Sequence, residues 1–292
     1  MLGNTYPNAS IRGGAATTPP VQGRTLQIGG GFSASSFDHE SFEGLMDPLV
    51  MVDHFTMTEP TFGAHPHAGM SAVSILFEDS TGFFHNRDSL GNDIDLGPGD
   101  LYWLKAGGGA VHDEKPRPGS RTHALQVFVN LPGRRKQDAP AALHVPAVEM
   151  PALRGDGFRV RVLLGASNGV EGASSPALPF TGLDVHLERG GEFVHEMRAD
   201  ADAWLLAVDG DAEVAVEGST TRLRQGLAMA VRSGRSATAL AMRTEAGAHL
   251  ALLEGAPIRE SFIQEGPFVM ANSQELRAVV AAHAAGELGS ID

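Results

Sequence analysis

The chain has no cysteine among its 292 residues. Disulfide bonds and thiolate ligands are therefore excluded, and any bound metal must be held by histidine and carboxylate side chains. No run of 18 apolar residues occurs, so we expect no membrane-spanning helix. The first residues also lack the basic stretch followed by an apolar stretch that marks a secretory signal, so we expect a cytoplasmic protein.

Positive charge is scarce as well. There are 22 Lys and Arg against 35 Asp and Glu, and the formal net charge is -13. A protein that binds nucleic acid directly needs a basic surface to neutralise phosphates, so we expect no direct nucleic-acid binding. An acidic chain can still join such a complex through a protein partner. With 42% apolar and 20% charged residues, the chain is typical of a soluble globular protein with one large core or two ordinary ones.

Short apolar runs separated by Gly, Pro, Asp and Asn fill most of the chain. Such strand-length runs with turn residues between them are typical of an all-β barrel or sandwich. They include residues 71–78, 101–104, 123–131, 203–208 and 248–253. One helix is predicted near the end, over about residues 273–285, where Asn272 and Glu275 can form a capping box.

A basic, turn-rich stretch near residue 135 gives the best domain boundary. We expect a first domain over residues 1–135, beginning with an irregular arm over 1–24, and a second domain over 136–292, beginning with a linker over 136–157. The two parts have a similar density of strands, which suggests an internal duplication.

Four side chains stand out in the first part. His65 and His67 are two residues apart, as are His112 and Glu114, and side chains at this spacing on a strand point to the same side. His-x-His alone is as often an ordinary pair of surface or partly buried histidines. If the two pairs face each other, however, three imidazoles and one carboxylate surround one point, which is a donor set for a divalent transition metal with two open positions.

The neighbourhood of these residues resembles the pirin family, within the cupin superfamily. The matching segments are Asp47-Pro-Leu-Val-Met-Val-Asp-His-Phe55, His65-Pro-His-Ala-Gly-Met70, Pro98-Gly-Asp-Leu-Tyr-Trp103, Ala106-Gly-Gly-Gly-Ala-Val-His-Asp-Glu114 and Gly266-Pro-Phe-Val-Met-Ala-Asn272. The chain departs from the usual family motif at Ala68, Met70 and Ser71, where the family has Arg, Phe and Glu. We expect the ligands to be kept despite this departure, whereas the shape and charge of the pocket around them should differ from the family's.

The resemblance implies a double cupin, in which two β-barrel or jelly-roll domains face each other and only the first holds metal. It implies His65, His67, His112 and Glu114 as the ligands, usually of iron. Fe(II) is the expected ion, with Mn, Ni, Cu, Co or Zn as alternatives, and no organic cofactor is expected. The second part contains His186 and His195 but no His-x-His, so the sequence predicts no second metal site there.

The resemblance also implies a flavonol 2,3-dioxygenase activity with quercetin-like substrates and O2. In that reaction Glu114 would be both a metal ligand and the catalytic acceptor of the flavonol hydroxyl proton. An alternative is a non-catalytic, redox-responsive regulator that binds a protein partner, such as a transcription factor or a metabolic enzyme. A third and weaker reading, a sugar isomerase, would need a basic anion-binding pocket.

Several large apolar side chains could line a pocket over the metal. They are Met51, Phe55, Met70 and Trp103. Aromatic and methionine side chains mostly fill protein cores, so we favour a core position for them.

Overall fold

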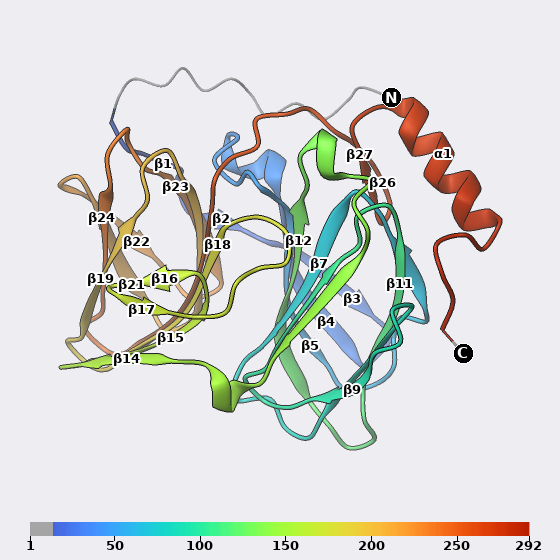
Figure 1. Ribbon diagram of the computed structural model, residues 1–292. Coiled ribbons are helices and arrows are strands. Elements are labelled where there is room, and N and C mark those ends of the chain that lie inside the picture. Colours follow the sequence, from blue (N-terminus) through green and yellow to red (C-terminus); the bar gives the residue numbers. More distant parts are fainter. Residues whose placement is uncertain (1–13, 292) are drawn as a thin grey trace.

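Two β-barrels lie side by side in the computed structural model, and helix α1 (Ser273–Ala284) packs on the outer side of the first (Figure 1). The structure describes residues 14–291. The prediction of an all-β chain with two barrels and one C-terminal helix is confirmed.

The first barrel consists of a seven-stranded sheet and a four-stranded sheet. The larger sheet has the order β13-β10-β7-β12-β5-β4-β3 and the smaller has the order β6-β11-β8-β9. Their bounds are β3 Arg24–Ile28, β4 Phe32–Asp38, β5 Leu49–Met57, β6 His65–His67, β7 Met70–Leu76, β8 Phe84–Asp88, β9 Asp93–Leu96, β10 Leu101–Lys105, β11 Ala110–Pro116, β12 Thr122–Asn130 and β13 Ala141–Val145.

The second barrel repeats this plan with the orders β1-β23-β20-β25-β18-β15-β14 and β19-β24-β21-β22. Its strands are β1 Ala16–Thr17, β2 Val21–Gln22, β14 Ala152–Gly155, β15 Phe158–Leu164, β18 Phe180–Leu187, β19 Glu192–Met197, β20 Asp202–Asp209, β21 Ala212–Val216, β22 Ser219–Leu223, β23 Leu227–Arg232, β24 Thr238–Arg243 and β25 Ala248–Gly255. Two small hairpins, β16 Ala166–Ser167 with β17 Val170–Glu171 and β26 Ile263–Glu265 with β27 Phe268–Met270, and three 3-10 helices, η1 His39–Phe42, η2 Gly133–Arg135 and η3 Ala147–Glu149, complete the elements. Apart from the edge strands β13 and β1, corresponding strands of the two barrels follow in the same chain order, as a duplication would produce.

The ends of the chain cross between the barrels. β1 and β2 pair with β23 of the second barrel, whereas β27 and α1 lie against the first barrel. Within the irregular arm expected over residues 1–24, residues 16–17 and 21–22 form short strands through these backbone pairings, and residues 1–13 lie outside the described residues. The segment expected as a linker, 136–157, contains β13, which extends the first sheet, and β14, which extends the second.

Alternation along the strands explains both the barrel interiors and the contact between the barrels. On β12, Leu125 and Val127 point out of the barrel into an apolar cluster that also contains Trp103 and Trp204, one tryptophan from each barrel. The intervening side chains, Gln126 and Phe128, point into the cavity of the first barrel. One strand thereby builds a site on one face and joins the two barrels with the other.

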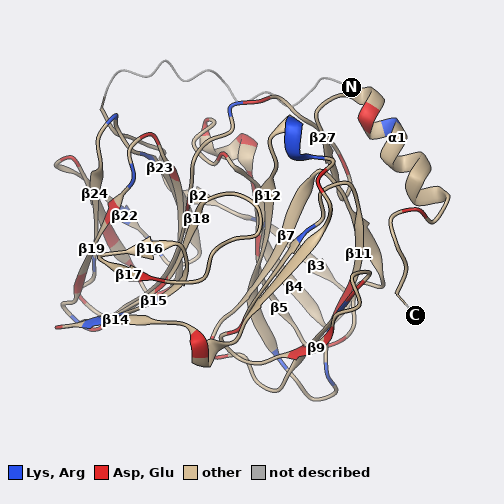
Figure 2. Ribbon diagram, viewed as in Figure 1, with Lys and Arg blue, Asp and Glu red and all other residues tan. Residues whose placement is uncertain are grey.

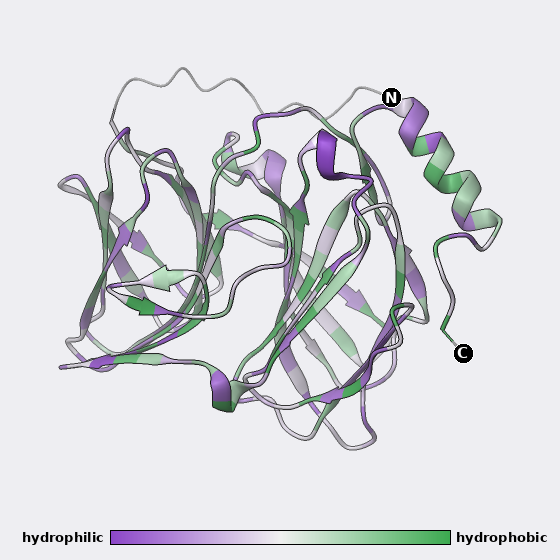
Figure 3. Ribbon diagram, viewed as in Figure 1, coloured by the Kyte–Doolittle hydropathy of each residue, from purple (hydrophilic) through white to green (hydrophobic). Residues whose placement is uncertain are grey.

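Helix α1 begins as its sequence predicts. The Asn272 side chain accepts hydrogen bonds from the backbone N–H groups of Gln274 and Glu275, and Glu275 Oε2 accepts the N–H of Ala271. Leu276 and Val279 bury the inner face of the helix. Figure 3 shows hydrophobic residues along this helix and along the strands of both barrels. Among residues 14–291 no helix has the length and hydropathy needed to cross a membrane. Figure 2 shows Lys and Arg dispersed over both barrels among Asp and Glu.

Candidate metal centre

Two short strands bring three histidines together. β6 pairs antiparallel with β11, and His65 lies directly opposite His112. Because His65 and His67 are two residues apart on β6, both imidazoles project to the same side of this small sheet, toward the barrel interior. Gly69, with φ of 73°, turns the chain sharply after His67, and a Cβ there would lie 1.9 Å from the carbonyl oxygen of Val269.

The three Nε2 atoms converge. His112 Nε2 lies 3.0 Å from His67 Nε2 and 3.0 Å from His65 Nε2. His65 Nδ1 is 2.9 Å from the Gly63 carbonyl oxygen, which can only accept, so Nδ1 carries the proton and the lone pair of a neutral His65 lies on Nε2. His112 Nε2 can carry only one proton, so it cannot form a good hydrogen bond with both neighbouring Nε2 atoms. A cation between the three nitrogens would remove this conflict. The residues present therefore fit a metal ion.

Burial keeps two of the imidazoles neutral, which is the form that binds metal. Burial, reinforced by the neighbouring His65, lowers the pKa of His67 to about 3. Burial also lowers the pKa of His112 well below the usual value, with contributions from His67 and His65. Protons therefore compete little with a cation at neutral pH.

Glu114 lies beside this cluster, on the same face of β11 as His112. Its Oε2 is 3.6 Å from His112 Nδ1, and its Oε1 accepts a hydrogen bond of 2.6 Å from the Ser74 hydroxyl. Burial raises the pKa of Glu114 to about 7; the charge of Asp113 acts in the same direction, and the Ser74 hydrogen bond acts against it. The structure thus places Glu114 next to the imidazoles, and its role as a fourth ligand stays a prediction.

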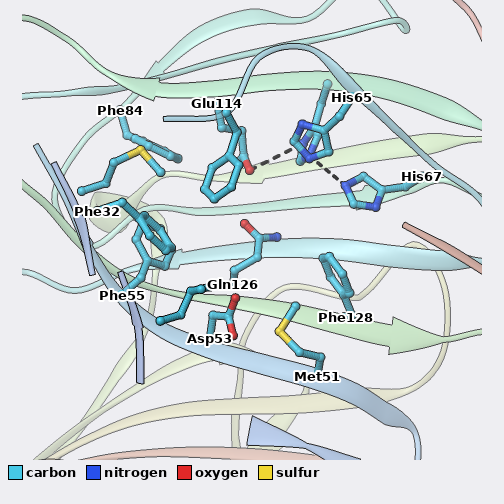
Figure 4. Close-up of a pocket in the computed structure, with 14 residues that line it drawn as sticks. Phe32, Met51, Asp53, Phe55, His65, His67, Phe84, Glu114, Gln126 and Phe128 are labelled. Atoms are coloured by element: carbon cyan, nitrogen blue, oxygen red, sulfur yellow. Dashed lines mark hydrogen bonds and ion pairs between the residues drawn. The ribbon is translucent and has the colours of Figure 1, made fainter. Parts of the chain in front are cut away.

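A cavity of about 220 Å³ opens from the histidines into the first barrel. Figure 4 shows Glu114 between the histidines at one end and Phe32, Phe55 and Phe84 at the other. Two polar side chains, Asp53 and Gln126, also reach the cavity. An apolar cavity with a few polar groups near one end is suited to a flat aromatic molecule with oxygen substituents.

The large apolar side chains considered from the sequence divide between the two alternatives. Met51 and Phe55 line the cavity, whereas Trp103 fills the core between the barrels and Met70 packs with Val269. Sequence reasoning missed Ser74, Gln126 and Asp53. The only indication in the sequence was that each is a polar residue at a strand position that faces the barrel interior, where apolar residues are usual.

Two family models match the chain. The pirin model matches residues 27–129, and the model of the pirin C-terminal cupin domain matches residues 182–289. The chain belongs to the pirin family. The resemblance inferred from the motifs and the double-cupin fold are thereby confirmed.

Pirins of distant organisms are similar over most of the chain. A pirin-like protein of Caulobacter vibrioides is 31% identical over 264 residues, which cover 86% of this chain and 90% of the relative. Mouse pirin is 29% identical over 236 residues, covering 80% of each chain. A Pseudomonas aeruginosa protein provisionally named a quercetin 2,3-dioxygenase is 29% identical over 242 residues, which cover 79% of this chain and 82% of that protein.

Solved structures of other proteins share the fold. A quercetin 2,3-dioxygenase from Acinetobacter baumannii superimposes with a TM-score of 0.82 at 24% identity, covering 96% of this chain and all of that one (100%). A bacterial pirin from Escherichia coli in complex with nickel(II) gives a TM-score of 0.64 at 17% identity, covering 83% of this chain and 99% of that one. At these identities the likeness concerns the fold.

Proposed function

We propose that this pirin-family chain is a metal-dependent dioxygenase of the quercetin 2,3-dioxygenase type. The observation that carries the proposal is the convergence of three imidazole Nε2 atoms at the end of an aromatic-lined cavity. The related proteins named as quercetin 2,3-dioxygenases support the same activity.

In this proposal His65, His67 and His112 hold the ion and Glu114 completes the set. When bound, a divalent transition ion supplies a Lewis acid that favours the deprotonated form of the flavonol hydroxyl. Three histidines and one carboxylate suit Fe(II), our expected ion, and also Mn, Co, Ni, Cu or Zn. A nickel-bound relative shows that the family fold accommodates such an ion in that protein.

The chain's own residues would position the substrate and move its proton. The phenylalanines of the cavity would hold the flat rings and exclude water, while Asp53 and Gln126 offer polar contacts to ring substituents. Glu114, which lies beside the imidazoles on β11, would accept the hydroxyl proton as a general base. Its Ser74 hydrogen bond would keep the carboxylate turned in one direction.

The test uses protein stripped of metal and reloaded separately with Fe(II), Mn(II), Co(II), Ni(II), Cu(II) and Zn(II). With quercetin, at least one loaded form should consume O2 and release carbon monoxide. His112→Ala should lower kcat/KM by more than about 100-fold, because it removes the central imidazole. The matched control His283→Ala, on an exposed position of α1, should retain activity. Metal binding without turnover by any loaded form would contradict the dioxygenase and favour the alternative of a regulator that docks on a protein partner.

A further inference from the structure

A second group of metal-binding side chains lies on the second barrel, outside its interior. Asp184 and His186 are two residues apart on β18 and share one face, and His186 lies directly opposite His249 on β25. Figure 1 shows β18 on the side of the second barrel that faces β12 of the first. The group therefore lies where the two barrels meet.

The three donors are already close. His249 Nε2 lies 2.5 Å from Oδ1 of Asp184, and His186 Nε2 lies 3.4 Å from the same oxygen. The two imidazole rings stack with centroids 4.1 Å apart and an angle of 12° between their planes. One donor atom from each residue lies within 4.8 Å of the other two. Two imidazole nitrogens and a carboxylate oxygen thus face one small volume.

The surrounding groups hold this arrangement in place. Arg161 on β15 binds the other oxygen of Asp184 through Nε at 2.8 Å and a terminal nitrogen at 2.7 Å, which leaves Oδ1 turned toward the histidines. The side chain of Asp184 is only 1% exposed, so its orientation is fixed. On the other side of the group, Phe77 packs edge-on against His249 with ring centroids 4.9 Å apart.

The first barrel places a carboxylate next to these three donors. Glu78 follows β7, and its Oε2 lies 3.7 Å from His186 Nε2. Arg159 of the second barrel pairs with the same carboxylate and keeps it at the contact. A movement of the Glu78 carboxylate toward His186 would add an oxygen ligand to the group of Asp184, His186 and His249.

We propose that Asp184, His186 and His249, with Glu78 from the other barrel, form a second site for a divalent transition cation, for which Zn²⁺ is the probe. Two imidazoles and two carboxylates match the nitrogen and oxygen ligands of tetrahedral zinc. An ion bound there would connect β18 and β25 to the end of β7 and so bind the two barrels to each other. The proposal uses no residue of the first metal centre and stands apart from the dioxygenase assignment.

The experiment measures the number of zinc ions bound per chain in a variant that lacks the first metal centre. The variant His65→Ala/His112→Ala is equilibrated with Zn²⁺, freed of excess ion by dialysis and analysed for bound metal by mass spectrometry. One equivalent per chain should remain, and Zn²⁺ should raise its Tm. Adding His186→Ala should abolish both effects, whereas adding His144→Ala, which removes a half-buried histidine outside both groups, should leave them unchanged.

The same measurement in the chain that keeps the first metal centre controls for misfolding of the His65→Ala/His112→Ala variant. His186→Ala alone should reduce the bound zinc from two equivalents to one, with the far-ultraviolet circular dichroism unchanged. A folded His65→Ala/His112→Ala variant that binds no zinc, or a stoichiometry that His186→Ala does not alter, would overturn the proposal. Co²⁺ gives an independent readout, because a tetrahedral site with these ligands should produce visible absorption bands that disappear in His186→Ala.

Discussion

At the scale of single residues, Glu114 shows how burial changes the ionisation of a carboxyl group. A carboxyl that ionises inside a barrel loses its contact with water, and only the Ser74 hydroxyl partly compensates. Its pKa of about 7 in the folded chain therefore exceeds the ordinary value of 4.5. The ionised side chain is therefore costly to the stability of the metal-free protein.

This cost predicts a pH dependence. A folded-state pKa above the unfolded one means that the folded protein binds more protons between about pH 4.5 and 7, so metal-free stability falls as the pH rises through this window. Glu114→Gln should remove the ionisation and raise the free energy of unfolding by up to about 3 kcal/mol at pH 8, but little at pH 4. Urea denaturation at both pH values measures the difference. Glu149→Gln, at an exposed position, is the control, and an equal effect of Glu114→Gln at the two pH values would contradict the prediction.

At the scale of elements, the turn after β12 secures the segment that follows the His-x-His strand. Lys136, just after η2, is 1% exposed, and its Nζ donates to the carbonyl oxygens of Gly69 at 2.9 Å and Val269 at 2.8 Å and to Asn130 Oδ1 at 2.5 Å. One ammonium group thus joins the turn after β6, the end of β12 and β27. A basic turn in the sequence gave no sign that one of its cations is buried.

Removing this ammonium should loosen all three elements. Lys136→Met keeps the length of the side chain but leaves three acceptors unpaired, so we expect a loss of about 3 kcal/mol or more in the free energy of unfolding. Because Gly69 follows His67 by two residues, metal affinity should also fall. Urea denaturation and metal titration measure the two effects. Arg134→Met, on the exposed side of the same turn, should change neither, and a Lys136→Met variant as stable as this control would refute the role.

At the scale of the whole molecule, the contact between the barrels combines apolar packing with half-buried histidines. His54 on β5 lies 2.7 Å from His123, whose Nδ1 donates to Asp79. Burial, with the nearby His123 and His249, lowers the pKa of His54 to about 4. The His54 imidazole at this contact is therefore neutral at neutral pH.

Acid should weaken this contact. The unfolded chain binds more protons than the folded one between about pH 6.5 and 4, so stability falls as the pH drops through that window. His54→Gln should remove a share of this loss, up to about 3 kcal/mol at pH 4, while changing stability less at pH 8. Thermal denaturation across this range tests the sign, with exposed His283→Gln as the control. A Tm profile for His54→Gln parallel to that of the unaltered chain would contradict the prediction.

The sequence predicted features that depend on local spacing and left out those that depend on register. Alternation along the strands predicted the all-β fold, and the spacing of His65 and His67 predicted two imidazoles on one face; both follow from the two-residue period of a strand. The pairing of His186 with His249 depends on which strands become neighbours, so the expectation of no second site followed from the missing His-x-His alone. The burial of Lys136 likewise depends on β27, which is far along the chain.

The crossing of the chain ends has a consequence for synthesis. The residues that seat the turn beyond His67 belong to β27, where Ala68 bridges Phe268 and the Val269 carbonyl meets Lys136. A ribosome delivers β27 only after every strand of both barrels. The nascent polypeptide therefore exposes its histidines early, whereas the support of the turn beyond His67 forms only after β27 has been synthesised.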